Sequence, residues 1–199
     1  VKSVFVSLSN NKKNIMNENM KKTALNFGLI ISAVGILFSL TAYVIDEKLF
    51  VNPIATILVL VLSVVLPFFA IRSYKKLNNG FASFREAFSA FILPVILSLF
   101  VNFLFNMLLH NVIDSDLSAR QGAMAFEGMM DMPDEQLEAT LSIMGLESMD
   151  ELESEMIKKT KEGASVVGSL KSSATGFIFF CFIGLIAAAV SKKNPPEFE

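Results

Sequence analysis

Hydrophobic residues form four long runs, which occupy residues 27–45, 49–71, 87–109 and 172–190 and contain no Asp, Glu, Lys, Arg or His. An α-helix rises about 1.5 Å per residue, so about 20 apolar residues cross a hydrocarbon layer roughly 30 Å thick. A charged side chain at mid-membrane costs up to roughly 3 kcal/mol, so uncharged runs suit this environment. We therefore predict four membrane spans at about 27–45, 49–71, 87–109 and 166–190.

Polar residues at the start of two runs suit helix N-termini. Asn52 and Pro53 supply a capping side chain and a proline at the first helical position, where an amide hydrogen is not needed. Ser83 and Glu86 have the spacing of a capping box, in which each side chain accepts a hydrogen bond from the other residue's amide. These pairs predict helix starts next to the second and third runs.

Charged residues are divided unequally between the two sides that four spans define. The N-terminal segment, the second connection and the C-terminal segment share one side and carry eleven Lys or Arg against four Glu. Residues 111–165, on the other side, carry thirteen Asp or Glu against four Lys or Arg. The positive-inside rule then predicts a multi-pass membrane protein with both termini in the cytoplasm.

The connection at residues 111–165 contains the spacing of short amphipathic helices. Apolar residues repeat at helical intervals from about residue 131 to Gly145, and a second helix is expected from Ser148, with Glu151 completing a capping box. Leu117, Met124 and Phe126 indicate a less regular helix before them. The predicted fold is an all-α, integral membrane four-helix bundle with short amphipathic helices in this extracytoplasmic connection.

The first 19 residues differ in character from the rest of the chain. They are rich in Asn and Lys and are followed by Met20-Lys21-Lys22, which looks like a natural start. We predict a disordered leader or upstream extension at residues 1–19 and a four-span membrane domain at residues 20–199. The first run exceeds the roughly 7–15 apolar residues of a secretory signal, and no small-residue cleavage site follows it, so we expect a retained span.

Reactive side chains are scarce. Cys181 is the single cysteine and His110 the single histidine, which excludes an intramolecular disulfide and a multi-cysteine metal site. No paired intramembrane carboxylates and no Ser-His pair occur within the runs. We therefore predict a protein that is not an enzyme, with no catalytic or metal-binding residues and no cofactor.

The third run carries a polar stripe with a spacing of four residues: Ser98, Asn102, Asn106 and His110. At 100° per residue the stripe winds through about 120° of the helix surface. Such amides most often hydrogen-bond to a neighbouring helix, and the alternative is a wet path through the membrane.

Small residues form a stripe along the fourth run: Gly168, Ser172, Gly176, Gly184 and Ala188. A looser stripe in the first run consists of Gly28, Ser32, Gly35, Ser39 and Ala42. Small residues let membrane helices approach closely, so these stripes predict contact faces. Packing within the chain is the first interpretation, and contact between copies in a homo-oligomer is the alternative.

Short motifs next to the spans resemble a bacterial family of four-span membrane proteins, domain of unknown function 4199. They are Met20-Lys21-Lys22, Asn79-Gly80 with Ser83 to Phe88, and Lys192 to Phe198. The resemblance covers the chain from Met20 to its end. It implies an inner-membrane location and the same four-span layout, and it brings no established activity or functional residues.

These patterns favour a non-enzymatic interaction, assembly or regulatory protein. Besides the lipid bilayer, its expected partner is a protein that contacts the acidic segment 111–165, with homo-oligomer formation as a further option. The negative charge of that segment disfavours nucleic acid. The alternative function is a small transporter or oligomeric channel that uses the polar stripe of the third span.

Overall fold

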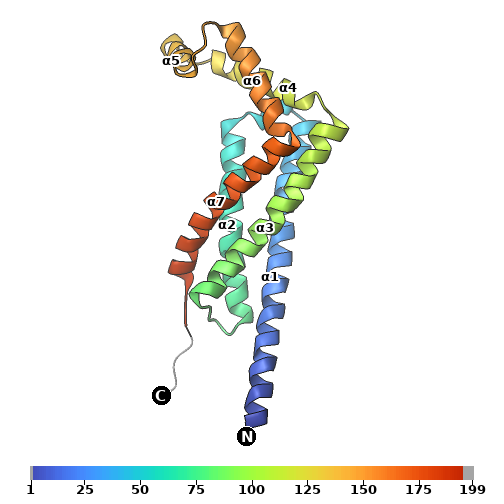
Figure 1. Ribbon diagram of the computed structural model, residues 1–199, viewed down its shortest axis with the longest axis vertical. Helices are drawn as coiled ribbons and strands as arrows, with labels where there is room; N and C mark the ends of the chain where they lie inside the picture. The colour runs from blue at the N-terminus through green and yellow to red at the C-terminus, as the bar shows by residue number, and fades with distance from the viewer. Residues whose placement is uncertain (1, 195–199) are drawn as a thin grey trace. The chain divides into compact units, whose positions relative to one another are not determined.

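The computed structural model describes the backbone of residues 2–194 and the side chains of residues 18–194, and this part of the chain is all-α (Figure 1). Its elements are α1 (Lys2–Val44), the 3-10 helix η1 (Glu47–Phe50), α2 (Pro53–Leu77), α3 (Phe84–Leu108), the π-helical turn η2 (Leu109–Ile113), α4 (Leu117–Met130), α5 (Asp134–Met144), α6 (Met149–Ala164) and α7 (Val166–Ser191). The predicted fold class is confirmed. The motif residues 195–198 lie outside the described residues.

Four helices are long and apolar enough to cross a membrane: Glu18–Val44, Pro53–Leu77, Phe84–Ile113 and Val166–Ser191. Only 17% of the most apolar stretch of α2 is buried inside the protein, against 33% for the third span. The remaining apolar side chains face outward, where contact with lipid removes them from water. The chain is therefore a membrane protein, and α2 offers the largest share of its apolar surface to lipid.

The second span begins four residues later than the apolar run. The Asn52 side chain accepts hydrogen bonds from the amides of Ile54 and Ala55, at 2.9 and 3.0 Å, so the helix starts at Pro53. Residues 49 and 50 belong instead to η1, whose first turn is capped by Asp46. Capping chemistry, and not hydrophobicity, sets this boundary.

Helix α1 begins at Lys2, so it includes most of the stretch expected to be a leader. Side chains of residues 1–17 lie outside the described residues. The prediction of a separate leader at residues 1–19 stays a prediction.

The described residues fall into two compact units, which we treat separately. The first unit comprises residues 1–34, 60–101 and 175–199, and the second comprises residues 35–59 and 102–174. Each long helix contributes one segment to each unit.

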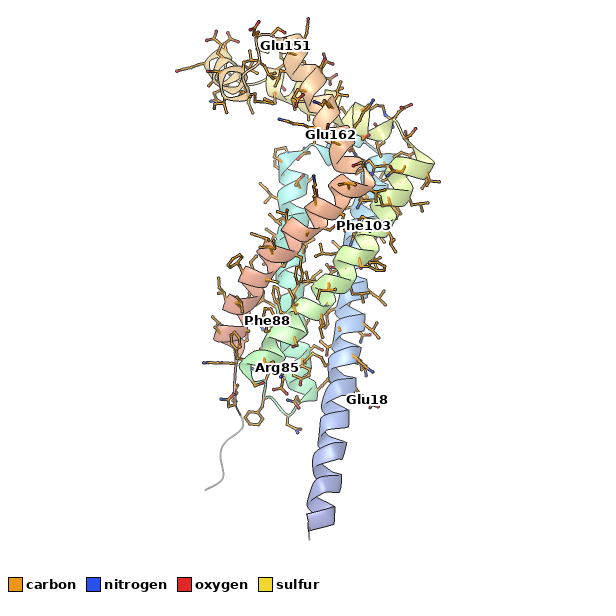
Figure 2. The ribbon with its side chains drawn as sticks, in the orientation of Figure 1. Glu18, Arg85, Phe88, Phe103, Glu151 and Glu162 are labelled. Atoms are coloured by element: carbon orange, nitrogen blue, oxygen red, sulfur yellow. The ribbon has the colours of Figure 1, made fainter. Side chains whose placement is uncertain are left out.

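In the first unit, all four long helices contribute to one hydrophobic core. Phe91 of α3 lies at its centre, fully buried, with Ile71 of α2 and Ala187 of α7, and Met20 of α1 packs against it. Phe88, labelled in Figure 2, lies at the edge of the same core. A Cβ atom on Gly184 would lie 2.9 Å from the Phe91 ring, so the glycine permits the close approach of α7 to α3.

One end of the first unit gathers three segments that are distant in sequence. Ala82 and Lys193 exchange two backbone hydrogen bonds of 2.9 and 2.8 Å, which join the α2–α3 connection to the segment after α7. Asn19 donates a hydrogen bond of 3.0 Å to the Leu77 carbonyl, which adds α1 to the same end. A chain that crosses a membrane four times has these three segments on the same side. The charge pattern predicts the same arrangement.

The capping box at the start of α3 is confirmed. The Glu86 carboxylate accepts hydrogen bonds from the amide and the hydroxyl of Ser83, at 2.8 and 2.7 Å, and the Ser83 oxygen accepts the Glu86 amide hydrogen at 3.3 Å. Glu86 also accepts a hydrogen bond of 3.1 Å from the Tyr74 hydroxyl. The box therefore links α2 to α3 as well as starting α3.

Candidate functional site

In the second unit, Arg120 of α4 fastens the connection after α3 to the connection between the first two spans. Its guanidinium donates hydrogen bonds from Nε and Nη2 to the two Glu47 oxygens, at 2.9 and 2.7 Å. It also contacts both Asp114 oxygens, at 3.2 and 2.7 Å. Bidentate pairs of this kind fix geometry as well as charge. We call these three residues the Arg120 clamp.

The clamp shifts the pKa values of Asp114 and Arg120. The hydrogen bond from Arg120 holds the pKa of the Asp114 carboxyl below its ordinary value, and the carboxylates of Glu47 and Asp114 raise the pKa of Arg120. The Arg120 side chain is 42% exposed, so solvent and salt screen the pairs. The clamp therefore serves mainly to position helix α4 and adds little to the stability of the fold.

Helix α4 packs tightly on α6 within the second unit. A Cβ atom on Gly122 would lie 2.6 Å from the Ile157 Cα, which is backbone that cannot move aside. Leu117 and Leu152 are fully buried in the same unit. We call α4, α5 and α6 the helical cap, and the Gly122 contact sets the spacing of two of its three helices.

The local signals at the cap helices are confirmed. Helix α5 ends at Gly145, whose φ of 67° is a left-handed conformation that glycine adopts readily. The Ser148 hydroxyl accepts the Glu151 amide hydrogen at 3.2 Å at the start of α6. Glu151, labelled in Figure 2, differs from the predicted box in one respect, because its carboxylate accepts the amide hydrogen of Glu147.

The cap exposes apolar side chains among its acidic residues. Ile143 of α5 is 85% exposed, and Met130, at the end of α4, and Met132, between α4 and α5, are about half exposed. Asp134 and Glu135 lie in the first turn of α5, where the helix dipole favours negative charge.

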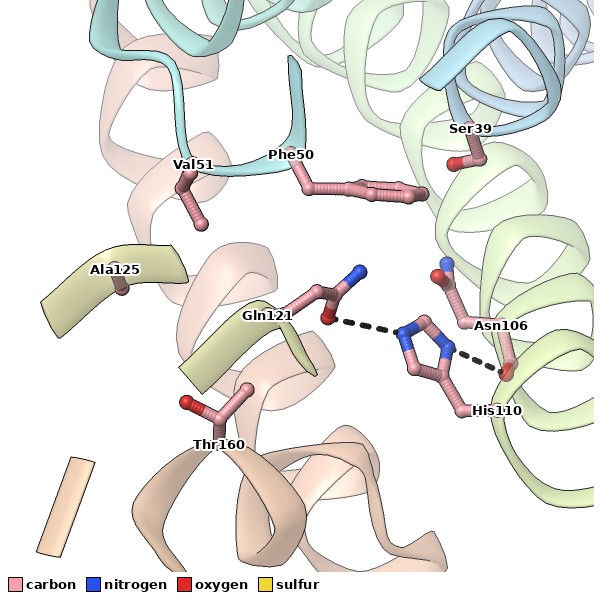
Figure 3. A pocket seen from close by; sticks show the side chains of 8 residues that line it. All are labelled: Ser39, Phe50, Val51, Asn106, His110, Gln121, Ala125 and Thr160. Carbon is pink, nitrogen blue, oxygen red and sulfur yellow. Dashed lines mark hydrogen bonds between the residues drawn. The ribbon is translucent and has the colours of Figure 1, made fainter. Parts of the chain in front are cut away.

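A polar cavity of about 310 Å³ lies within the second unit (Figure 3). Its polar lining consists of Ser39 from α1, Asn106 from α3, His110 from η2, Gln121 from α4 and Thr160 from α6, and its apolar lining of Phe50, Val51 and Ala125. The volume is at the lower end of the range for small-molecule sites. No charged residue lines the cavity, apart from the ionisable ring of His110.

The His110 ring bridges two walls of this cavity. Its Nδ1 lies 3.2 Å from the Asn106 carbonyl oxygen, and its Nε2 lies 3.3 Å from Oε1 of Gln121 (Figure 3). With the hydrogen on Nδ1, the ring donates to the Asn106 carbonyl, and Nε2 accepts from Gln121 once its amide turns and presents the NH₂ group. With the hydrogen on Nε2, the ring donates to Oε1 of Gln121. In either arrangement one end of the Gln121 amide stays available to the cavity.

A π-helical turn places His110. The Asp114 amide donates to the Leu109 carbonyl at 2.9 Å, five residues earlier, and Leu109 is fully buried. A π turn inserts one extra residue and rotates the next part of the chain, and such turns often occur at functional sites. Sequence spacing alone gives no sign of this turn.

The structure divides the predicted polar stripe between the two units. In the first unit, Ser98 is buried and donates a hydrogen bond of 2.9 Å to the Val95 carbonyl of its own helix. In the second unit, Asn102 lies against Gly35 of α1. The contact is so close that a Cβ atom on Gly35 would clash with the side-chain amide oxygen of Asn102. Asn106 and His110 alone of the four line the cavity.

The small-residue stripe of α7 is used unevenly. Gly184 and Ala188 are buried in the first unit, where Gly176 also makes ordinary contact with Leu99. In the second unit, Gly168 lies against the backbone at Glu162, and Ser172 is exposed. Within the first unit the stripe residues Gly184 and Ala188 are buried, and the stripe as a single contact face stays a prediction.

Sequence reasoning identified two of the cavity residues as polar-stripe members and placed Ser39 in a packing stripe. It missed Gln121, Thr160 and Phe50. Helical periodicity indicates one face of one helix, whereas these residues come from three other elements. No local signal joins them.

No curated protein and no solved structure matches the chain. One family profile, described as a protein of unknown function (DUF4199), matches residues 26–193. That range begins inside the first span, in α1, and includes the other three spans and the helical cap. The chain therefore belongs to the DUF4199 family of proteins of unknown function.

Proposed function

We propose that this chain is a non-enzymatic, multi-pass protein of a bacterial inner membrane, whose helical cap faces outward and binds a partner protein with a basic surface. The observation that carries the proposal is the Arg120 clamp. It joins α4 to the loop between the first two spans and so presents the cap in a fixed orientation. A preorganised surface loses less entropy when it binds a partner than a loose one does.

The orientation in the membrane rests on charge. The end of the first unit that holds Ala82 and Lys193 also carries Lys75, whose ammonium donates a hydrogen bond of 3.0 Å to the Ser191 carbonyl. The sequence places Arg72, Lys76 and further basic residues next to this end. By the positive-inside rule this end faces the cytoplasm, so the clamp and the cap lie on the other side.

The choice of partner rests on charge complementarity. Residues 111–165 carry nine more acidic than basic side chains, the difference between thirteen and four. Anionic lipid and a second copy of the cap would be repelled, whereas a basic protein surface would be attracted. Ile143, Met130 and Met132 would supply the apolar centre of such an interface.

Two further observations support this function over the alternatives. Both His110 nitrogens contact amide oxygens, so the ring is not paired with a nucleophile or a carboxylate as in a hydrolase. Asn102 lies against Gly35, and Asn106 donates a hydrogen bond of 2.8 Å to the Asn102 carbonyl. Asn102 thus packs α3 against α1, and the Asn106 NH₂ group is used within its own helix, which favours an interaction protein over a transporter.

Site-specific photo-cross-linking in intact cells tests the proposal. A photoreactive residue replaces Ile143 on α5, and a control replaces Leu58 on α2, which is similarly apolar and 59% exposed. We expect a discrete protein adduct from position 143 and none from position 58. Replacing Glu135 and Glu138 with Gln lowers the adduct yield at position 143, since both charges lie on the same helix.

Three outcomes would refute the proposal. They are the absence of a protein adduct at position 143, an adduct made only with another copy of the chain, and a yield that the Gln substitutions leave unchanged. Expression and membrane insertion of each variant are checked by the amount of full-length protein in washed membranes.

A further inference from the structure

We infer that the cavity of the second unit binds a small uncharged polyol of monosaccharide size. The site lies between the cap and the outer ends of the helices that belong to this unit, and no known role is attached to it. The inference is independent of the partner surface on α5, so either can fail without the other.

Unused hydrogen-bonding groups face the cavity. The Ser39 hydroxyl makes no hydrogen bond to the described part of the chain, although Ser39 is only 9% exposed. Asn106 uses its NH₂ group toward the Asn102 carbonyl, which leaves Oδ1 for another partner. Gln121 uses one end of its amide toward His110. Polar groups inside a protein normally find partners, so these groups are available to water or to a ligand.

The chemistry of the lining selects the class of ligand. A charged ligand would enter a site with no opposite charge, and burying an unpaired charge is costly. An apolar ligand would leave the Ser39, Asn106 and Gln121 groups unpaired. A polyol fits, because each hydroxyl both donates and accepts hydrogen bonds and so matches either orientation of the Gln121 amide.

Size and shape agree with this class. A volume of about 310 Å³ lies at the lower end of the range for small-molecule sites, which suits a ligand the size of a pentose or hexose. The Phe50 ring forms one wall above the polar side chains (Figure 3) and is held edge-on by Phe38, with ring centroids 6.4 Å apart. An aromatic wall covers the C–H face of a sugar while the polar groups take its hydroxyls.

The test is ligand-observed NMR, by saturation transfer, on the full chain in phospholipid nanodiscs. Detergents with sugar headgroups are avoided because they would compete. The probes are neutral hexoses, pentoses and inositol, compared with glucuronate, glucosamine and cyclohexanol. We expect transfer to at least one neutral polyol and competition among those that bind.

Variants connect the signal to the cavity. Asn106→Ala and Gln121→Ala should each raise the dissociation constant roughly three- to tenfold, because each removes one or two neutral hydrogen bonds to the ligand. Gln136→Ala, on α5 and outside the cavity, is the matched control and should bind as the parent does. Ser39→Ala removes one oxygen atom and keeps the test valid if the larger changes disturb folding.

Three results would overturn the inference. The first is that no neutral polyol gives transfer, so that the cavity holds water only. The second is that the charged or the apolar probes bind better than the polyols. The third is that binding is the same in the parent and in the Asn106, Gln121 and Ser39 variants.

Discussion

Arg120 and Glu47 form a bidentate ion pair across 73 residues of sequence, with N–O distances of 2.9 and 2.7 Å. The pair connects the first extramembrane loop to the third, and Asp114 holds the same guanidinium from the other side. The ion pair therefore lets the loop between the first two spans position helix α4, and α6 packs on α4.

Removing the clamp should loosen α4. In Arg120→Gln, hydrogen–deuterium exchange of the α4 amides is expected to be roughly two- to fivefold faster, the effect of losing an exposed ion pair. Glu47→Gln should give a similar increase, and the double variant should add little, because both changes remove the same contact. Lys161→Gln removes a charge from α6 and serves as the control. Unchanged exchange in Arg120→Gln would contradict the positioning role.

The Asp114 contribution should persist in mild acid. Its pKa is lowered in the folded protein, chiefly by the hydrogen bond from Arg120, so its contribution is present above the unfolded pKa of about 3.9 and is lost as the pH falls through the folded value. The difference in α4 exchange between the parent and Asp114→Asn should therefore be constant from about pH 7 to about pH 4.5 and shrink below about pH 4. A difference that disappears near pH 6 would refute this assignment.

Gly122 should tolerate no side chain. In Gly122→Ala the new methyl would meet the backbone of Ile157, and overpacking of this kind costs about 1–3 kcal/mol. Gly128→Ala, on the same helix with open space around it, should be neutral or stabilising by up to about 1 kcal/mol. Proteolysis of the cap reads out both variants. Equal resistance to protease in the two variants would show that α4 and α6 are not in close contact.

Thr23 offers a stabilising substitution in the first unit. Its hydroxyl is buried and has no hydrogen-bond partner within the described residues, and an unpaired buried polar atom costs about 1–3 kcal/mol. Thr23→Val keeps the shape and removes the hydroxyl, so thermal stability in nanodiscs should increase. The Thr56 hydroxyl is exposed and donates to the Asn52 carbonyl, so Thr56→Val should not increase thermal stability. A lower melting temperature for Thr23→Val would indicate a partner for this hydroxyl.

The fold could be predicted wherever neighbouring residues carry the information. Ser83 with Glu86 and Ser148 with Glu151 lie three residues apart, and both pairs cap the helices that their spacing indicates. The Asn52 cap and the first helical position at Pro53 are likewise confirmed, although the apolar run itself begins at residue 49 and hydrophobicity alone would not give this boundary.

The candidate site could be predicted only in part. Asn106 and His110 stand out as polar residues in an apolar helix, and both line the cavity. Their partner Gln121 is an ordinary polar residue of an amphipathic helix, and it meets His110 only after the π turn redirects the chain. Contacts made through tertiary structure leave no periodic trace in the sequence.

The central claim is that the cap faces outward from the inner membrane, and labelling with a membrane-impermeant maleimide tests it most directly. In a Cys181→Ala background, Ser142→Cys reports on α5 and Lys76→Cys on the end of α2, and both positions are exposed. In intact spheroplasts we expect position 142 to react and position 76 to react only after permeabilisation. Reaction of position 76 before permeabilisation, with position 142 protected, would contradict the account.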